Sequence, residues 1–174
     1  MKVALGIWLV VLVVTVVASG YLDGCFVEDS APRPEAAAFE LVRLDGVPVR
    51  FEEQRGRVLI LDFWATWCAP CEVQMPILQE IWERRGDEPL TIVGVSMDTD
   101  PPQKVSTWLA ERGLTYPIAI ADQQLAVDYG VWSFPTLVVV DPSGRIARSH
   151  QGVLSRPELD DLIDQLQREI PPAS

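Results

Sequence analysis

The feature that most constrains the fold is a pair of cysteines, Cys68 and Cys71, that stands between an apolar run and an expected helix. The run, RVLILDFW, is almost continuously apolar, which predicts a strand buried on both faces near the middle of a sheet. The helix is expected to cover about residues 69–85, to end at Gly86 and to kink at Pro76. A buried strand that leads directly into a helix indicates a layered α/β domain.

The neighbouring segments extend this layered pattern. Upstream, FELVRLDGVPVRF alternates apolar and polar residues around Asp45 and Gly46, which predicts a hairpin. Downstream, LTIVGVSM predicts a second buried strand, and a helix with one apolar face is expected to stop at Gly113. YPIAIA then predicts a short strand, and QQLAVDYG a short helix.

The last part of the chain predicts two strands and a closing helix. FPTLVVVD and GRIARSHQG are joined by DPSG, which has the composition of a turn. Ser155 and Glu158 have the spacing of a capping box at the start of a helix. The apolar residues of that helix are expected on one face: Leu159, Leu162, Ile163, Leu166 and Ile170. Two β-α-β passages followed by a hairpin and a helix predict three layers.

An uncharged run, Val3 to Leu22, precedes the globular part. As a helix it would be about 30 Å long, which matches one hydrocarbon core. Lys2 is the charge before it and acidic residues follow, so we expect the rest of the chain on the extracytoplasmic side of a bacterial inner membrane. We expect residues 1–22 to form an anchor or signal segment, residues 23–38 a linker, and residues 39–174 the folded domain.

Three fates of the amino-terminal run fit its sequence. It can remain as a single-span anchor, or it can be a signal peptide cleaved near ASG. Alternatively, LDGC resembles a bacterial lipobox, in which Cys25 would carry the lipid. Asp23 in the middle of this motif departs from the lipobox pattern. All but simple cleavage would keep the protein tethered at the membrane.

Charge and cysteine content exclude two classes of protein. The formal net charge is -11, which argues against a nucleic-acid partner, because a phosphate backbone requires clustered Lys and Arg. Three cysteines are too few for a fold built on disulfides. Cys68 and Cys71 therefore need a chemical explanation.

The position of the pair favours thiol chemistry. Cys68 precedes the first turn of the expected helix, where unpaired amides and the helix dipole favour an anion. This setting lowers the pKa of a thiol and raises its thiolate fraction. Cys71 lies one turn further, close enough to form a disulfide with Cys68. Pro70 restrains the loop between them. The Cys68 thiolate is expected to attack a substrate disulfide, and Cys71 to resolve the mixed disulfide.

At these residues the chain resembles the thioredoxin superfamily. DFWATWCAPC followed by Pro76, then SFPT, a final hairpin and a helix carry the resemblance. An amino-terminal membrane segment, an extra hairpin, and a helix-strand unit inserted at roughly 101–129 resemble the TlpA/ResA-like exported branch. The resemblance implies a thioredoxin fold with a central mixed sheet, an amino-terminal β-hairpin and that inserted unit.

The resemblance also implies roles for individual residues. Cys68 would be the nucleophile, Cys71 the resolving cysteine, and Pro135 a cis-proline facing the pair. Asp62 occupies the position of the buried acid of thioredoxins. Its apolar strand predicts a raised carboxyl pKa, so that it can exchange protons with Cys71 directly or through a water. The alternative is a structural Asp that only accepts hydrogen bonds.

Two residues depart from the superfamily pattern. Many TlpA/ResA-like proteins have a Glu three residues after the second cysteine, where this chain has Gln74. Thioredoxins have a Lys near the buried acid, and the matching position here is Gly94. Asp62 would then be the carboxyl that serves the pair, without a cationic partner.

A second set of residues is expected to bind the substrate. Trp67, Ala69 and Pro70 surround Cys68 in the sequence, and Trp67 is expected to line the redox surface. The free backbone of Phe134 is expected to pair with an extended segment of a client protein. Trp64 is expected in the core, and the other tryptophans are interpreted as packing residues.

Other functions fit the cysteine pair less well. A structural disulfide would close too short a loop to stabilise the chain much. A Sco-like copper delivery protein would use His150, but its cysteines are spaced one residue further apart. A peroxiredoxin-type peroxidase needs a Pro-x-x-x-Thr-x-x-Cys motif, and Thr66 is only two residues before Cys68. A zinc site lacks a fourth ligand.

The sequence therefore predicts a protein-disulfide reductase or exchanger. Its redox centre is the cysteine pair itself, with no metal and no other cofactor. The expected partners are client proteins with disulfides, a membrane-side thiol electron donor, and the inner membrane. Cytochrome c maturation is one process that the resemblance suggests.

Overall fold

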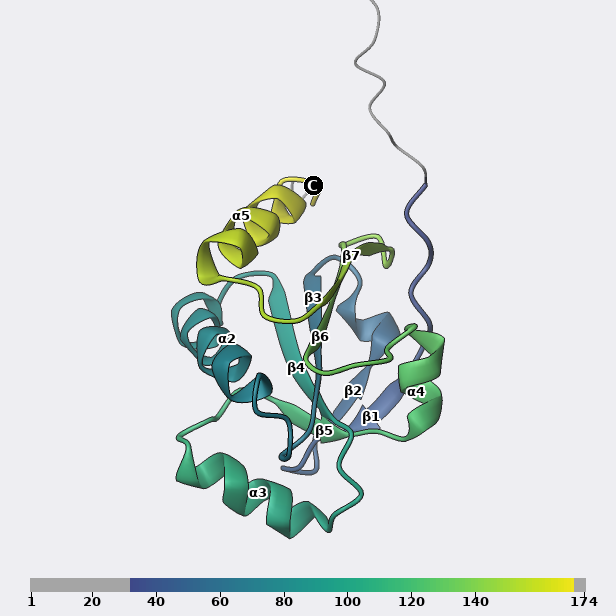
Figure 1. Ribbon diagram of the computed structural model, residues 1–174. Coiled ribbons are helices and arrows are strands. Elements are labelled where there is room, and N and C mark those ends of the chain that lie inside the picture. Colours follow the sequence, from purple (N-terminus) through teal and green to yellow (C-terminus); the bar gives the residue numbers. More distant parts are fainter. Residues whose placement is uncertain (1–31, 171–174) are drawn as a thin grey trace, which may run out of the picture. The chain divides into compact units, whose positions relative to one another are not determined.

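A computed structural model describes residues 32–170 (Figure 1). The expected anchor at residues 1–22 and Cys25 lie outside the described residues. The central sheet has five strands in the order β5-β4-β3-β6-β7. Its parallel part contains β3 (Val58–Trp64), β4 (Leu90–Ser96) and β5 (Ile118–Ile120), and its antiparallel part adds β6 (Thr136–Val140) and β7 (Ile146–Gln151). The sheet is mixed, as predicted, and β3 lies in its middle.

The predicted amino-terminal hairpin is present. β1 (Glu40–Val42) pairs antiparallel with β2 (Pro48–Arg50). Gly46 has a φ of 84° in the connecting turn, a backbone conformation that side chains with a Cβ rarely adopt. A short 3-10 helix, η1 (Phe51–Gln54), follows and buries Phe51.

Helices cover both faces of the sheet. α2 (Cys71–Arg85), α3 (Pro102–Glu111) and α5 (Arg156–Gln167) pack into one apolar cluster with Val58, Ile60 and Trp64 of β3. α4 (Gln123–Asp128) and the β1-β2 hairpin pack into a second cluster with the alternate β3 residues. Figure 1 shows α2 and α5 on the opposite side of the sheet from α4. These are the three layers that the sequence predicts.

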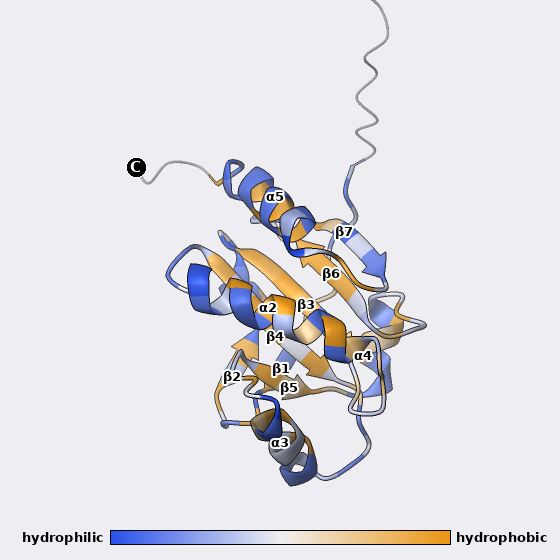
Figure 2. Ribbon diagram, turned by 60° about the vertical axis from the view of Figure 1, so that its left-hand side comes forward, coloured by the Kyte–Doolittle hydropathy of each residue, from blue (hydrophilic) through white to orange (hydrophobic). Residues whose placement is uncertain are grey.

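The apolar character of the central strands explains why they are buried. All seven residues of β3 are buried, and Figure 2 shows the inner strands β3, β4 and β6 as predominantly hydrophobic, whereas the edge strand β7 is polar. Side chains alternate between the two faces of a strand. Asp62 therefore lies on the same face as Ile60 and Trp64, which is the face covered by α2.

Two helix boundaries differ from the prediction. α2 begins at Cys71 rather than near Ala69, because residues 68–70 form a turn in which the Cys71 amide donates to the Cys68 carbonyl (3.0 Å). α5 ends at Gln167, so Ile170 is not on the predicted helical face. Ile170 precedes a proline, and this position disfavours helical backbone. The capping box of Ser155 and Glu158 is present as predicted.

Residues just before the predicted domain boundary contact the folded domain. Arg33 forms ion pairs with Asp141 (2.8 Å) and Glu169 (2.7 Å). Ala36 is buried, and its amide donates to the carbonyl of Gly144 (3.1 Å). The sequence places this stretch in the linker, but the contacts of the domain begin before Phe39.

Candidate active site

The two cysteines lie at the junction of β3 and α2, and they are bonded to each other. The S–S distance is 2.10 Å. Cys71 is the first residue of α2, and its backbone N–H donates to Cys68 Sγ at 3.3 Å. A helix-start amide directed at a sulfur stabilises negative charge on that sulfur. When the pair is reduced, this contact favours a thiolate at Cys68.

The two sulfurs differ in accessibility. Cys68 is 5% exposed and lines a surface pocket, whereas Cys71 is 0% exposed and lies among core residues. An incoming disulfide can therefore reach Cys68 but not Cys71. This arrangement matches the predicted order of attack, with Cys68 first and Cys71 resolving.

The pocket at Cys68 has aromatic walls. Its volume is about 410 Å³, and it is lined by Trp67, Cys68, Ala69, Pro70, Trp132, Ser133 and Phe134. The rings of Trp67 and Phe134 lie 5.7 Å apart between centroids, at an interplanar angle of 58°. The Phe134–Pro135 peptide bond is cis, as the resemblance implies. All four residues predicted to bind substrate thus lie around Cys68.

Trp132 is a site residue that the sequence interpretation missed. It was interpreted as a packing residue, but it is 78% exposed and lines the same pocket as Trp67, which is 71% exposed. Trp132 stands in the loop between α4 and β6, so its neighbours along the chain do not reveal its exposure. The sequence feature that could have identified Trp132 as a site residue is its position three residues before Pro135. Trp64, by contrast, is in the core as predicted.

Asp62 is fully buried on the α2 side of β3. Burial raises its pKa to about 7, and a hydrogen bond from Tyr116 opposes this increase. The Tyr116 hydroxyl donates to Asp62 Oδ2 at 3.0 Å. The other oxygen, Oδ1, has no hydrogen-bond partner among the described residues. The direction of the pKa shift agrees with the prediction, and a pKa of about 7 allows the carboxyl to gain and lose a proton near neutral pH.

Tyr116 was not identified from the sequence. Its side chain is buried, and its pKa lies well above the usual value because of burial and the nearby Asp62 charge. Nothing in the residues around Tyr116 in the sequence indicates that its hydroxyl contacts a carboxylate. The contact joins residues 54 positions apart and depends on how β5 packs beside β4.

Gln74 is buried in α2, at the position where many relatives in the TlpA/ResA-like branch have Glu. Its Oε1 accepts a hydrogen bond from the Leu154 backbone N–H at 2.7 Å. Its Nε2 has no partner within residues 32–170. Gln74 thus ties α2 to the segment before α5, and it places no carboxyl near the pair.

A second carboxylate, Asp98, holds the turn that precedes Cys68. It accepts hydrogen bonds from the Thr66 backbone N–H (3.0 Å), the Thr66 hydroxyl (2.6 Å) and the Ser96 hydroxyl (2.8 Å). Asp98 is buried just after the end of β4. The sequence analysis did not single it out, although an acidic residue directly after a buried strand is a usable signal.

The inserted helix α3 also braces the start of α2. Trp108 packs on Trp64 with ring centroids 5.1 Å apart, and the Arg112 guanidinium lies 3.8 Å from the centre of the Trp108 ring. Arg112 Nε also donates to Glu72 Oε2 at 3.2 Å, in the first turn of α2. The inserted unit thereby contacts the helix that carries Cys71.

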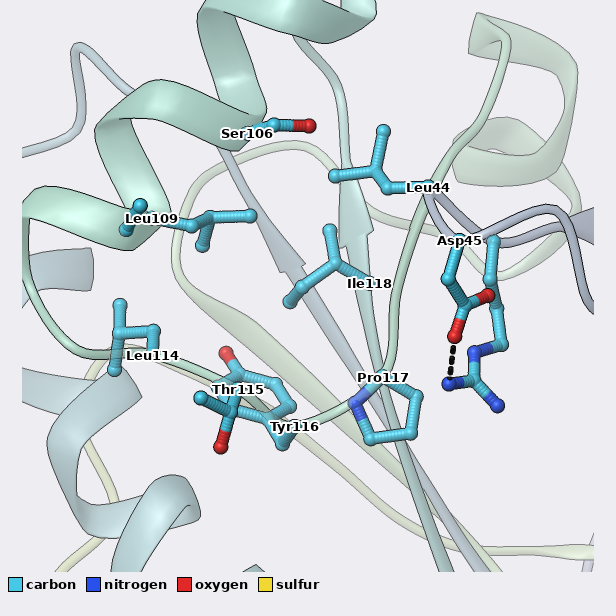
Figure 3. Close-up of a pocket in the computed structure, with 11 residues that line it drawn as sticks. Leu44, Asp45, Ser106, Leu109, Leu114, Thr115, Tyr116, Pro117 and Ile118 are labelled. Atoms are coloured by element: carbon cyan, nitrogen blue, oxygen red, sulfur yellow. Dashed lines mark hydrogen bonds and ion pairs between the residues drawn. The ribbon is translucent and has the colours of Figure 1, made fainter.

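A second pocket lies away from the cysteines (Figure 3). Its volume is about 370 Å³, and it is formed by α3, the β1-β2 turn and the segment that leads into β5. Leu44, Leu109 and Ile118 are among its apolar lining residues, and Arg43 pairs with Asp45 at its edge. It contains neither cysteine.

Within residues 32–170, no group of three or more His, Cys, Asp or Glu side chains is arranged to hold a metal ion. Over the same residues, no helix has both the length and the apolar character needed to cross a membrane. His150 lies on the edge strand β7, opposite Leu137.

Fold and site together define a disulfide oxidoreductase with a thioredoxin fold and a redox-active cysteine pair. The family described as Redoxin matches residues 27–166. The chain belongs to this family and is a ResA-like member of the thioredoxin superfamily.

Curated relatives carry the same assignment in their names. The chain is 30% identical over 132 residues to the thioredoxin-like protein YneN of Bacillus subtilis, covering 75% of this chain and 77% of YneN. It is 29% identical over 162 residues to the thiol-disulfide oxidoreductase ResA of Geobacillus thermodenitrificans, covering 90% and 92% of the two chains.

Solved structures have the same fold. A thiol:disulfide interchange protein of Chlorobium tepidum matches with a TM-score of 0.71 and 24% identity, over 79% of this chain and 98% of that chain. An exposed lipoprotein thioredoxin of Streptococcus pneumoniae matches with a TM-score of 0.65 and 28% identity, over 75% of this chain and all of that chain (100%).

Proposed function

We propose that the protein is tethered at a bacterial inner membrane and reduces or exchanges disulfides in client proteins on the extracytoplasmic side. The uncharged run Val3 to Leu22 supports the tether, either as a single span or as a signal that directs lipidation at Cys25. A structural relative that is named an exposed lipoprotein supports the lipid form. The resemblance to TlpA/ResA-like proteins makes apocytochromes c one class of candidate client.

The proposed reaction starts with the reduced pair. The Cys68 thiolate attacks one sulfur of the client disulfide, so that a Cys68–client bond forms and the client S–S bond breaks. The released client thiolate takes a proton from solvent. Cys71 then loses its proton and attacks Cys68 Sγ. The Cys68–Cys71 bond forms, the second client thiolate leaves, and two electrons have passed to the client. A membrane-side dithiol donor would reduce the pair again.

Asp62 is proposed to accept the Cys71 proton. It lies on the β3 face that packs against α2, and its Oδ1 is free of other hydrogen bonds among the described residues. A carboxyl with a pKa of about 7 can accept and return a proton near neutral pH. A client thiolate or solvent then removes the proton from Asp62.

The aromatic pocket is proposed to hold the client. No hydrogen bond between backbone groups within the described part of the chain uses the Phe134 N–H or carbonyl, so both are free to pair with an extended segment. Trp67 and Trp132 are largely exposed aromatic residues that line the same pocket as Cys68. Ala69 and Pro70 form the small, uncharged rim next to the attacked bond.

The observation that carries the proposal is the accessible Cys68 with a buried Cys71 behind it. The direct test is to trap clients on a Cys71→Ala variant expressed in a bacterium, since this variant cannot resolve the mixed disulfide. We expect disulfide-linked client proteins that dithiothreitol releases, and none with a Cys68→Ser/Cys71→Ala control. Absence of linked proteins from the Cys71→Ala variant would contradict the proposal.

Tethering is tested separately by fractionation of the full-length protein. We expect it in the membrane fraction, with the domain accessible to protease only from the extracytoplasmic side. If Cys25→Ala releases the protein, the anchor is a lipid; if the variant stays in the membrane, the helix spans. Recovery of the wild-type protein mainly from the cytosol would overturn the tether.

A further inference from the structure

Tyr116 contacts Asp62, the proposed proton acceptor, but has no part in the reaction proposed above. It lies between α3 and β5, and its side chain is 2% exposed. Its hydroxyl reaches across β4 to the carboxyl of Asp62 on β3, with 3.0 Å between Tyr116 Oη and Asp62 Oδ2. Figure 3 shows where the residue stands, between Thr115 and Pro117 beside the second pocket. A phenylalanine ring would fill the same space. The buried hydroxyl and its hydrogen bond to the Asp62 carboxyl therefore indicate a role beyond packing.

The backbone around Tyr116 is fixed from two sides. Gln79 of α2 accepts hydrogen bonds from the backbone N–H groups of Thr115 (2.7 Å) and Tyr116 (3.1 Å) through a single oxygen, Oε1. From the sheet, the Gly94 N–H donates to the Pro117 carbonyl at 2.8 Å. The helix that carries Cys71 and the strand next to Asp62 therefore both set the position of Tyr116.

Gly94 makes room for this contact. It pairs directly with Asp62 in the β3-β4 register. A Cβ added at Gly94 would lie 2.3 Å from Ile118 Cδ1 and 3.1 Å from Tyr116 Cε2. The space beside Gly94 is therefore filled by Tyr116 and by Ile118 of β5. A larger residue at position 94 would have to displace Ile118 or the Tyr116 ring that reaches Asp62.

We propose that Tyr116 is a positioning residue for thiol exchange, because its hydroxyl holds Asp62 Oδ2 and leaves Oδ1, which has no hydrogen-bond partner among the described residues, free to accept a proton. This inference rests on the proposed role of Asp62. A hydrogen bond to the charged carboxylate favours the charged form. Tyr116 thereby keeps Asp62 partly ionised at neutral pH, where an Asp in the same apolar site without this donor would stay protonated.

The electrostatics of the site agree with this role. Burial raises the Asp62 pKa and the Tyr116 hydrogen bond lowers it. On the helices that pack against this face, Glu72 pairs with Arg112 at the start of α2, and the buried Arg85 pairs with Glu88, Asp160 and Asp164 at the other end of α2. The cysteine pair belongs to the apolar cluster between these helices and the sheet, on the same face of β3 as Asp62.

The test is the pH dependence of the resolving step in Tyr116→Phe. The reduced protein is mixed with an aromatic disulfide that releases a coloured thiolate, once when Cys68 attacks and once when Cys71 resolves. We expect the pH midpoint of the second phase to move upward by about one pH unit or more, the size expected for loss of a hydrogen bond to a charged group. The first phase should keep its pH profile.

Tyr129→Phe is the matched control. Tyr129 is also buried, and its hydroxyl donates to the Ala37 carbonyl (2.6 Å) in the apolar cluster on the other face of the sheet. Loss of this hydroxyl should leave both phases at their wild-type midpoints. An equal shift in both variants would mean that Tyr116 acts only through general stability, and would overturn the inference.

A third variant separates this inference from the proposed role of Asp62. In Asp62→Asn the part of the pH profile that follows Asp62 should be lost, which leaves the ionisation of Cys71 itself, and adding Tyr116→Phe should change nothing further. If Asp62→Asn keeps the wild-type pH profile, the proposed proton transfer to Asp62 is wrong, and the positioning role of Tyr116 is wrong as well. If Asp62→Asn loses the profile while Tyr116→Phe keeps it, only the inference about Tyr116 fails. NMR titration of the Asp62 carboxyl carbon in the oxidised proteins gives an equilibrium check that needs no turnover.

Discussion

The backbone N–H of Cys71 donates a hydrogen bond to the sulfur of Cys68 across 3.3 Å. This contact exists because Cys71 is the first residue of α2 and Cys68 lies in the turn that leads into it. It gives the two cysteines different chemistry although they are neighbours in sequence. The sulfur of Cys68, which lines the pocket, receives the amide, and Cys71 is completely buried in the apolar core.

The first prediction concerns the reactivity of the two thiols. In the reduced protein at mildly acidic pH, we expect iodoacetamide to alkylate Cys68 at least about tenfold faster than Cys71, because only the thiolate reacts and only Cys68 is accessible. Peptide mapping by mass spectrometry after timed quenching measures the two rates. Equal rates would contradict the assignment of Cys68 as the attacking residue.

The second prediction concerns stability and pH. The pKa of Asp62 is about 7 in the folded protein, against an ordinary value of about 4 in the unfolded chain. The folded state therefore binds more protons between these values, so stability falls as pH rises from about 4 to about 7. Asp62→Asn should remove this loss and be more stable at pH 8 by up to about 4 kcal/mol.

Urea unfolding of the oxidised protein at several pH values measures this effect. Asp161→Asn serves as the control, because Asp161 is exposed on α5 and should leave the pH profile of stability unchanged. A wild-type protein whose stability stays constant between pH 4 and pH 7 would show that Asp62 is not protonated in that range.

The third prediction concerns Trp132. The exposed ring of Trp132 lines the pocket at Cys68. Trp132→Ala should therefore lower kcat/KM for a protein disulfide by about tenfold, which corresponds to about 1.4 kcal/mol of binding free energy. The rate with a small disulfide reagent should stay within about twofold, since such a reagent does not need the pocket walls.

Trp132→Phe is expected to keep most of the protein-client activity, because it preserves an aromatic face. Insulin reduction and reaction with the small reagent, measured side by side, provide the comparison. A parallel loss of both activities in Trp132→Ala would indicate damage to the redox centre rather than loss of a client contact.

The fourth prediction concerns Asp98. Asp98→Ala removes the acceptor of the Thr66 and Ser96 hydrogen bonds, so that the buried Ser96 hydroxyl and the partly buried Thr66 N–H and hydroxyl lose this partner. We expect a loss of about 2–4 kcal/mol in the free energy of unfolding. Attack by Cys68 should also slow, because the turn before it is no longer fixed. Asp100→Ala, which breaks only the surface pair with Lys104, should change stability by less than about 1 kcal/mol. Matching losses in the two variants would rule out a special role for Asp98.

The sequence by itself determined the features that depend on neighbouring residues. The apolar run of β3, the helix start at the cysteines and the capping box of Ser155 are local patterns, and each predicts its element because backbone periodicity and end groups act over a few residues. The order of these elements was enough to predict the three-layer α/β fold, and the resemblance to the thioredoxin superfamily implied the mixed central sheet. The sequence motif also identified Cys68, Cys71 and Pro135 directly.

Only the tertiary structure decided which distant groups meet. Tyr116 reaches Asp62 because β5 packs beside β4 and Gly94 leaves space between them. Trp132 is exposed because its loop lies at the surface beside Cys68, although a tryptophan is most often at least partly buried. Arg33 joins the domain through carboxylates more than a hundred residues away. Such contacts leave no periodic trace in the chain, since their partners are set by how whole elements pack.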